Sequence, residues 1–475
     1  MSNAAHWEQL YDQAYTRGME RISQINGVAC AFHSVIDGFI RLTPDLLRPV
    51  LERDSTLKQA ALAGCKGEPP LEILSPQDFI QGMFYSLYRG SALQRMIRSE
   101  ETYQWVLDTF GSGELRLGGT SANMARALTP LDIPVTIYAN PLTVELAELF
   151  GDFDNLHVIR KKNGQFTLET PRQAAEEHGV FAIHWIFEFG TDFEMELDGV
   201  VINPHRANRY IPSWNPRNNQ FTLDPVFAEG FLNLADQHRY LFFSGFHILS
   251  ETYLDGSTCD DVIRPLGEYL DQLRQRSPEL IIHLELASIA SLKVRRAVLN
   301  HVMNHVHSIG LNETELPLML ELFGDTLVQD VLKQEPNVFD YANACMVIMS
   351  QTGLQRIHFH NLGYYLCLEK KAIHTPQDTR DSLLFAAIMA AARAKNGLFH
   401  SREDIQPGLE PPISEIGLRE TELLAMKIDE PGIAEEGIGT FGSLHLSIIP
   451  TKLVPNPLFT VGLGDTISTG ALLTE

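Results

Sequence analysis

The chain has 475 residues but only five cysteines, no long apolar run and no net positive charge. The cysteines lie far apart and form no CxxC pair, so we expect reduced thiols rather than a zinc site or a disulfide framework. No apolar run approaches the roughly 18 residues of a membrane-spanning helix. The polar, acidic start MSNAAHWEQLYDQ is unlike a signal peptide, and we therefore expect a cytoplasmic protein with no membrane partner.

The formal net charge of -23 argues against nucleic acid and anionic membranes as main partners. It does not exclude a phosphorylated substrate, because a few Arg and Lys side chains can make one cleft locally positive. Since 44% of the residues are hydrophobic and 20% are charged, a folded globular protein is expected. The length predicts more than one domain.

The sequence contains no GxxxxGK[ST] P-loop, and no GxGxxG follows its first strand, so a nucleotide must bind in another way. The candidate is the stretch VGLGDTISTGALL, residues 461–473. Gly462 and Gly464 allow a tight turn, and the helix that follows offers unpaired N–H groups to an anion such as phosphate. Asp465 could accept a proton from an attacking hydroxyl. The alternative is a turn with an Asp helix cap.

Strands and helices alternate after residue 225, which predicts a mostly parallel sheet covered by helices on both faces. An apolar run at 27–32 and another at 134–140 read as further strands of this sheet. Ligands of such sheets bind beyond the carboxyl ends of the strands. The expected strands do end in polar or glycine residues, namely Ser244-Gly245, Glu285, Gly310 to Glu313, and His360-Asn361.

Short strands follow one another between about residue 155 and residue 212, a texture typical of antiparallel β structure. Together with helices expected at 44–64 and 76–98, they predict a smaller α+β domain inserted into the α/β domain. We expect residues 1–37, 120–158 and 213–475 in the large domain, and residues 38–119 and 159–212 in the small one. The basic residues of the small domain could hold phosphate, although Lys161 and Lys162 could equally lie on a solvated turn.

Two carboxylates at neighbouring strand ends are candidates for a magnesium site. Alternation along a strand puts His283 and Glu285 on one side, and the spacing of Asn312 and Glu315 puts them on one face of a helix start. Glu285 and Glu315 could hold Mg²⁺ through water. The alternative for Asn312 and Glu315 is a capping box.

Stretches along almost the whole chain resemble one known family when they are taken together and in order. The sequence is similar to the ADP-dependent sugar kinases, the archaeal glucokinase and phosphofructokinase group of the ribokinase-like superfamily. The matching stretches are GVACAFHSVID, LRLGGTSANMA, IHWIFEF, ANRYI, LFFSGFHIL, HLELAS, SIGLNETEL, RIHFHNLGYYL, IIPTK and VGLGDTIS.

The resemblance implies a ribokinase-like large domain, a lid formed by the small domain, and a set of residue roles. Asp465 would activate the sugar hydroxyl, the backbone of Gly462 and Gly464 would form the anion hole, and Arg209 would reach the nucleotide phosphates. Glu285 and Glu315 would organise Mg²⁺. The sugar would contact Asp37, Gly118, Gly119 and His184, and the nucleotide would contact Asn312, His360, Ile449, Lys452, Val461 and Gly464.

Departures from the family pattern bear on the acceptor sugar. Gln94 stands where the family glucokinases carry a Glu, and a neutral amide loses the charge-assisted hydrogen bond of that carboxylate. The family Asn-x-Asn-Ile-Asp has become the segment HSVID, residues 33–37. Both changes disfavour glucose, and Lys161, Lys162 and Arg206 could bind a sugar phosphate.

We therefore expect an ADP-dependent 6-phosphofructokinase that makes fructose 1,6-bisphosphate and AMP. The alternatives are an ADP-dependent glucokinase, an enzyme with both activities, and a non-catalytic regulator that binds a sugar phosphate. Neither nucleic acid nor a membrane is an expected partner, and we expect a monomer or a weak homo-oligomer.

Overall fold

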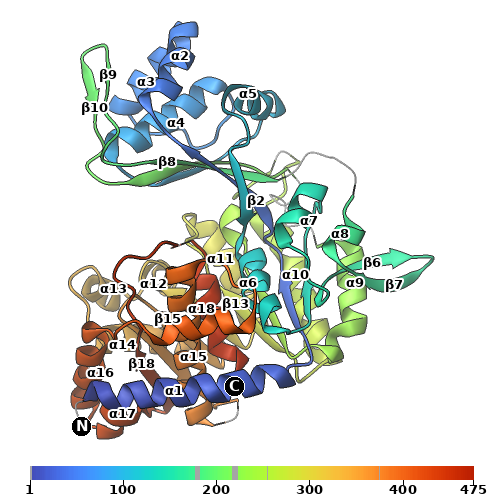
Figure 1. Cartoon of the computed structure of the whole chain (residues 1–475), viewed down its shortest axis with the longest axis vertical. Coiled ribbons are helices and arrows are strands. Elements are labelled where there is room, and N and C mark those ends of the chain that lie inside the picture. The colour runs from blue at the N-terminus through green and yellow to red at the C-terminus, as the bar shows by residue number, and fades with distance from the viewer. Residues whose placement is uncertain are drawn as a thin grey trace.

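A large lower body and a small upper body make up the molecule (Figure 1). The computed structural model describes residues 3–176, 182–216, 223–253, 255–373, 375–459 and 461–474. The lower body, the large domain, contains an 11-stranded sheet, and the upper body, the small domain, contains a 5-stranded sheet. The α/β fold class expected from the sequence is confirmed.

The large sheet is mostly parallel, as expected. Every neighbouring pair from β15 through β6 is parallel, whereas β16, β17, β18 and β7 add antiparallel pairs at the two edges. The antiparallel strands after His360 were not expected. In spatial order the strands are β17 (Ile438–Phe441), β18 (Leu444–Pro450), β16 (Tyr364–Glu369), β15 (Arg356–His360), β14 (Ser308–Asn312), β13 (Ile281–Glu285), β12 (Tyr240–Phe243), β1 (Val28–Ala31), β5 (Val135–Ile137), β6 (Leu156–Lys162) and β7 (Gln165–Glu169).

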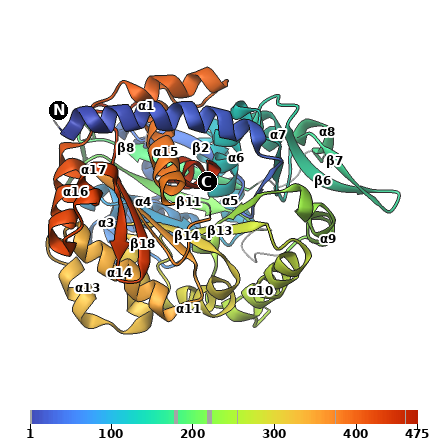
Figure 2. The same ribbon diagram turned by 90° about the horizontal axis from the view of Figure 1, so that it is seen from below.

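Helices cover both faces of the large sheet, which explains why its central strands are buried along their whole length. Figure 2 shows the two layers on opposite sides of the strands. One layer contains α1 (Asn3–Arg21), α6 (Thr120–Leu128), α7 (Val144–Phe150), α15 (Pro376–Asn396) and α18 (Leu463–Leu473). The other contains α9 (Pro225–Leu234), α10 (Cys259–Arg276), α11 (Leu292–His301), α12 (Glu315–Leu320), α14 (Val338–Gln351), α16 (Glu415–Ile428) and α17 (Pro431–Glu436). The short helices α8 (Pro171–Ala174) and α13 (Thr326–Leu332) complete the domain.

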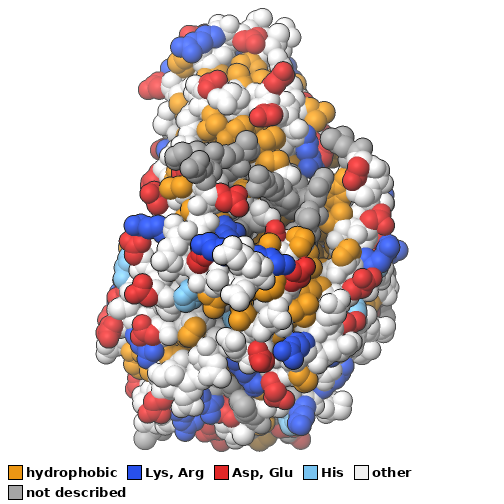
Figure 3. All heavy atoms as spheres, turned by 90° about the vertical axis from the view of Figure 1, so that its right-hand side faces the viewer, with side chains coloured by type: hydrophobic (Ala, Val, Ile, Leu, Met, Phe, Trp, Pro, Cys, Tyr) orange, Lys and Arg blue, Asp and Glu red, His pale blue; other side chains and the backbone are white. Residues whose placement is uncertain are grey.

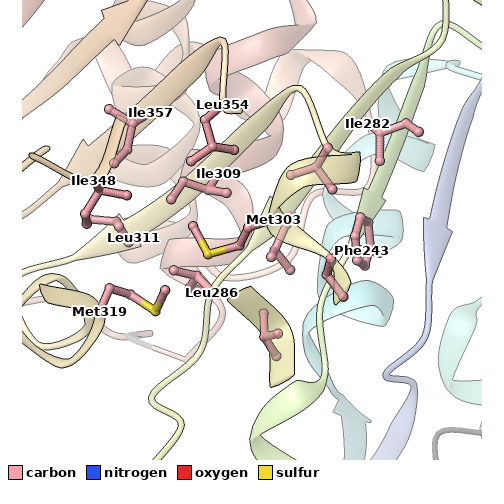
Figure 4. Close-up of a cluster of buried hydrophobic side chains, with 14 of the residues drawn as sticks. Phe243, Ile282, Leu286, Met303, Ile309, Leu311, Met319, Ile348, Leu354 and Ile357 are labelled. Atoms are coloured by element: carbon pink, nitrogen blue, oxygen red, sulfur yellow. The ribbon is translucent and has the colours of Figure 1, made fainter. Parts of the chain in front are cut away.

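The core between the sheet and the second layer is built from aliphatic side chains of alternate strand positions. Ile309 and Leu311 of β14 point into it beside Ile357 of β15, and Ile348 and Met319 meet them from the helices (Figure 4). Full burial of one such side chain contributes about 1.5–3 kcal/mol. This core fixes the strand ends that carry the polar residues of the site.

The small domain packs helices against one face of a mixed sheet. Its strands are β3 (Leu93–Met96), β11 (Asn208–Trp214), β8 (Ile183–Phe189), β2 (Val35–Arg41) and β4 (Glu114–Gly118), in this order, with a separate hairpin of β9 (Met195–Leu197) and β10 (Val200–Ile202). Its helices are α2 (Pro44–Arg53), α3 (Ser55–Lys66), α4 (Pro76–Arg89) and α5 (Glu100–Phe110). The helix expected at 76–98 ends early because Gly90, with φ 58°, caps α4 and lets the chain turn into β3.

The sheets place three segments differently from the boundaries expected from the sequence. Residues 35–37, expected in the large domain, are the first residues of β2 in the small sheet. Strand β6 pairs with β5 and forms a hairpin with β7, so residues 156–169 extend the large sheet. Ser213 and Trp214, expected in the large domain, belong to β11 of the small sheet. Hairpin composition alone could not show which sheet edge these strands would join.

All five cysteines are free, as expected, and all five are buried. Within the described parts of the chain, the helices are all too short or too polar to cross a membrane. On the side of the molecule shown in Figure 3, basic side chains are interspersed with acidic ones over both domains.

Candidate active site

The carboxyl ends of the central strands point toward the small domain, and α18 begins beside them. Gly462 adopts φ 73°, a left-handed conformation that favours glycine, and leads directly into α18. Asp465 lies in the first turn of this helix. Burial, and next the charge of Glu285, raise the pKa of Asp465 to about 7, although Arg393, Asn123 and His360 oppose the shift. A carboxylate with this pKa suits a general base at neutral pH.

Glu285, at the end of β13, lies beneath this helix start. Its Oε2 accepts a hydrogen bond from Ser468 of α18, and its Oε1 lies 3.3 Å from Nε2 of His360. Nε2 of His283 lies 3.6 Å from Oε2 of Glu285, on the same side of β13, as side-chain alternation predicted. Burial alone would raise the pKa of Glu285, but interactions with His283 and His360 outweigh it and lower the pKa to about 2. Glu285 is therefore held as an anion.

Glu315 and Asn312 form the reciprocal hydrogen bonds of a capping box. Oδ1 of Asn312 accepts from the backbone N–H of Glu315 at 3.1 Å, and Oε2 of Glu315 accepts from the N–H of Asn312 at 3.0 Å. The capping box, the alternative expected for this pair from the sequence, is therefore confirmed. Burial, and next the charge of Glu285, raise the pKa of Glu315 well above its ordinary value. Two carboxyl groups are thus held close together, and the charge of Glu285 disfavours a second charge on Glu315.

One face of the small sheet carries four of the residues expected to contact substrates, namely Asp37, His184, Gln94 and Arg209. Asp37, His184 and Ser213 are direct partners on β2, β8 and β11, so their side chains share a face. The register places Gln94 and Arg209 on the same face, and Gln94 donates to Ser213 at 3.4 Å. The opposite face forms the core with the small-domain helices, which Figure 1 shows above the sheet, while the large domain lies below it.

Asp37 is enclosed at the junction of the domains. Burial raises its pKa to about 7, opposed by the charge of Arg209. A Cβ on Gly118 would lie 2.2 Å from Oδ1 of Asp37, so a side chain there would displace the Asp37 carboxylate. Gly119 has φ 89°, and a Cβ there would lie 2.5 Å from the carbonyl oxygen of His33. Both glycines predicted at this turn are thus required by close approach.

The structure does not bring every expected residue to this site. Ile449 is fully buried in β18, and the ammonium of Lys452 is bound to Glu8 of α1. Neither side chain is available to a nucleotide, because β18 directs Ile449 into the core and α1 covers Lys452. Val461, 40% exposed and directly before Gly462, remains accessible.

Lys161 and Lys162 lie on the β6–β7 hairpin, which projects sideways from the large domain (Figure 1). They form ion pairs of 2.8 Å with Glu229 and 2.7 Å with Glu169. Arg206 is instead in the small domain, where its Nε donates to the carbonyl of Gly90 at 2.8 Å. The expected cluster of these three cations is therefore not formed.

A family model confirms what the geometry suggests. The model of the "ADP-specific Phosphofructokinase/Glucokinase conserved region" matches residues 26–474. The chain belongs to this family. An ADP-specific phosphofructokinase of Methanosarcina acetivorans is 31% identical and aligns over 98% of this chain and 96% of its own length. An ADP-dependent glucose/glucosamine kinase of Pyrococcus abyssi is also 31% identical, over 99% and 98% of the two chains.

A solved structure of the same family has nearly the same fold. It is described as an "ADP-dependent kinase complex with fructose-6-phosphate and ADPbetaS". Its sequence is 29% identical to this one. The alignment covers 100% of this chain and 98% of the solved chain, with a TM-score of 0.84. Membership of the ADP-specific phosphofructokinase/glucokinase family makes the chain a sugar kinase that takes its phosphoryl group from ADP.

The residues present fit a hydrated divalent cation of such a kinase. Two buried carboxylates, Glu285 and Glu315, repel each other, which a cation would relieve. Among the described residues, no three His, Cys, Asp or Glu side chains converge closely enough to hold a bare metal ion. This donor set suits Mg²⁺, which keeps several waters and binds phosphate oxygens.

Several residues at the candidate site were not predicted from the sequence. Asn123 and Arg393 contact the turn before α18, and Ser468 contacts Glu285. His247, which follows β12, packs its ring 4.7 Å from that of His33, and His184 of the small domain lies 5.4 Å from His33. The polar strand ends were a usable signal for His247, whereas Arg393 lies in an Ala-rich helix and gave none.

Proposed function

We propose that the protein transfers the β-phosphoryl group of ADP to the 1-hydroxyl of fructose 6-phosphate, giving fructose 1,6-bisphosphate and AMP. The observation that carries this proposal is the position of Asp465, a carboxylate with a raised pKa in the first turn of α18, beside Glu285. The polar face of the small sheet is on the side of the large domain (Figure 1). Family membership supplies ADP as the donor.

The start of α18 and its glycines suit the stabilisation of a phosphoryl group during its transfer. The N–H groups after Gly462 have no partner within α18, and the helix dipole is positive at this end. They stabilise charge that develops on the equatorial oxygens. Asp465 accepts the proton of the sugar hydroxyl as the new P–O bond forms and the bond to AMP breaks.

Glu285 and Glu315 would hold Mg²⁺ through water beside this point. A bound ion would supply positive charge that offsets the negative charge of the phosphate oxygens. Glu285 is suited to this role because its interactions with His283 and His360 keep it ionised. Ser468 fixes its other oxygen.

The small domain supplies the second wall of the site. In this proposal Asp37, His184 and Gln94 contact the sugar, and Arg209 contacts phosphate; their positions on one face of the small sheet support these roles. A wall that closes over the reactants excludes water, which would otherwise accept the phosphoryl group.

Two observations favour fructose 6-phosphate over glucose. Gln94 presents a neutral amide where the resemblance places the glutamate of glucokinases. A family member 29% identical to this chain is described in complex with fructose 6-phosphate. The glucose/glucosamine kinase of equal identity keeps glucose as the second candidate.

A substrate matrix tests the proposal: ADP or ATP as donor, fructose 6-phosphate or glucose as acceptor, with Mg²⁺, measuring release of AMP or ADP. Activity with ADP and fructose 6-phosphate supports it. Activity with glucose alone would make the protein a glucokinase, and ligand binding without turnover would make it a regulator. Gln94→Glu should lower the KM for glucose at least about tenfold, because the carboxylate restores a charge-assisted hydrogen bond.

A further inference from the structure

Arg393 is a buried cation of α15 whose contacts the mechanism above does not use. Its side chain is 5% exposed. Among the described residues, no carboxylate lies within ion-pairing distance of its guanidinium, unlike Arg380 on the same helix, which pairs with Asp381 and Glu436. The charge of Asp465 offsets part of the cost of burying the Arg393 guanidinium. A buried guanidinium without a direct ion pair is still costly, so its location calls for a reason.

Two chains of contacts lead from this guanidinium to the two ends of the GLGD turn, residues 462–465. In the first, Nη1 donates to Oγ1 of Thr466 at 2.9 Å, and the Thr466 hydroxyl donates to the carbonyl of Gly462 at 3.0 Å. In the second, Nη2 donates to Oδ1 of Asn123 at 2.9 Å, and the Asn123 side chain lies close enough to Asp465 to favour its ionised form.

The second chain has a fixed direction. A guanidinium can only donate, so the amide oxygen of Asn123 must face Arg393. The amide nitrogen is then the atom left to face the Asp465 carboxylate. Arg393 therefore determines which end of the Asn123 amide is turned toward Asp465.

The turn is also packed directly on Arg393. A Cβ on Gly462 would lie 2.5 Å from Nη2. A second buried guanidinium, Arg126 of α6, lies close enough that Arg393 contributes, after burial, to lowering its pKa to about 10. Two cations behind the turn add positive potential where a phosphoryl group would sit.

We infer that Arg393 is a positioning residue for phosphoryl transfer: it holds the anion-hole glycine Gly462 and, through Asn123, orients Asp465. This inference rests on the proposed function. Arg393 touches no substrate in this role, so its loss should act on the chemical step. A misplacement of about 1 Å at a reacting group costs on the order of 100-fold in rate.

The test compares Arg393→Lys and Arg393→Ala with the wild-type chain under saturating ADP and sugar. The inference predicts that kcat falls by about 100-fold in both, because a lysine keeps the charge but cannot bond Thr466 and Asn123 together. The KM values for both substrates should change less than about threefold, since ground-state binding is retained. Millimolar guanidinium should restore part of the kcat of Arg393→Ala and none of that of Arg393→Lys.

Arg380→Lys is the matched control, because Arg380 is a buried arginine about 20 Å away along the same helix. Its kcat should equal that of the wild type. The double variant Arg393→Lys, Asn123→Ala should be no slower than the slower single variant, because both changes break one chain. This comparison uses the lysine variant and holds even if Arg393→Ala does not fold.

The outcomes separate the two claims. A wild-type chain that transfers no phosphoryl group from ADP to any sugar overturns both. A wild type with normal turnover, together with a kcat of Arg393→Lys within about threefold of it, overturns only the positioning role. An equal rise of KM and fall of kcat, with no guanidinium rescue, would also overturn it, because Arg393 would then be merely structural.

Discussion

A Cβ on Gly310 would lie 2.0 Å from Oε2 of Glu285 and 2.9 Å from Oγ of Ser468. Gly310 and Glu285 are direct partners on β14 and β13. The absence of a side chain at Gly310 therefore gives the Glu285 carboxylate its place under α18. The position of Glu285 at the end of β13 thus depends on glycine at the paired position of β14.

Gly310→Ala should consequently displace Glu285 and Ser468. We expect kcat to fall at least about 100-fold, and the free energy of unfolding to fall by about 1–3 kcal/mol, as for overpacked cores. Steady-state kinetics and denaturant unfolding measure both effects. Gly353→Ala is the control, because its nearest neighbouring atom would be 3.6 Å from the new Cβ. Normal turnover in Gly310→Ala would show that Glu285 is not required where it stands.

The raised pKa of Asp465 predicts an acidic limb in the pH profile of kcat/KM. The general base works only when ionised, so activity is present above a pH of about 7 and is lost as the pH falls through it. Below that point, kcat/KM should fall about tenfold per pH unit. Asp465→Asn should reduce kcat at least about 100-fold while leaving nucleotide binding intact. A flat wild-type profile from about pH 5.5 to about pH 8 would exclude Asp465 as the base.

The raised pKa of Asp37 predicts that the free energy of unfolding, rather than the reaction rate, depends on pH. Its pKa is about 7 in the folded protein against an ordinary 3.8, so the folded state holds a proton that the unfolded state releases. Stability is fully present below the unfolded value and is lost as the pH rises to the folded value, by at most about 4 kcal/mol.

Asp37→Asn removes this loss, so the variant should gain in Tm relative to the wild type as the pH rises from about 4 to about 8. Thermal unfolding at several pH values measures the difference. Asp45→Asn, on the exposed surface of α2, is the control and should give the same difference at every pH. A Tm difference that shrinks with rising pH would contradict the burial of Asp37.

Much of the site could be predicted because its signals are local. Alternation along β13 placed His283 beside Glu285, and the spacing of Asn312 and Glu315 indicated the capping box that the structure contains. Arg393 gave no such signal, because its partner Asn123 is 270 residues away along the chain. A single Arg near the end of an apolar helix reads as an ordinary charge at the helix C-terminus.

The direction of strands and the partners of surface charges were also beyond local reading. Strand β16 returns antiparallel after β15 because only a short turn at 361–363 connects them, whereas a parallel neighbour needs a long crossover. Lys161 and Lys162 read as phosphate ligands by composition. Their carboxylate partners, Glu229 and Glu169, became visible only when the hairpin was placed.

Cations on the two domains should therefore differ in their effect on substrate binding. Arg209→Ala should raise the KM for ADP by about 10–100-fold, since a charge-assisted hydrogen bond to phosphate contributes about 1.5–3 kcal/mol. The double variant Lys161→Ala, Lys162→Ala should leave the KM values for ADP and fructose 6-phosphate within about twofold, because exposed ion pairs on an outlying hairpin contribute little. Initial-rate kinetics with each substrate varied in turn measure both. A raised fructose 6-phosphate KM in the lysine variant would place the 6-phosphate at the β6–β7 hairpin after all.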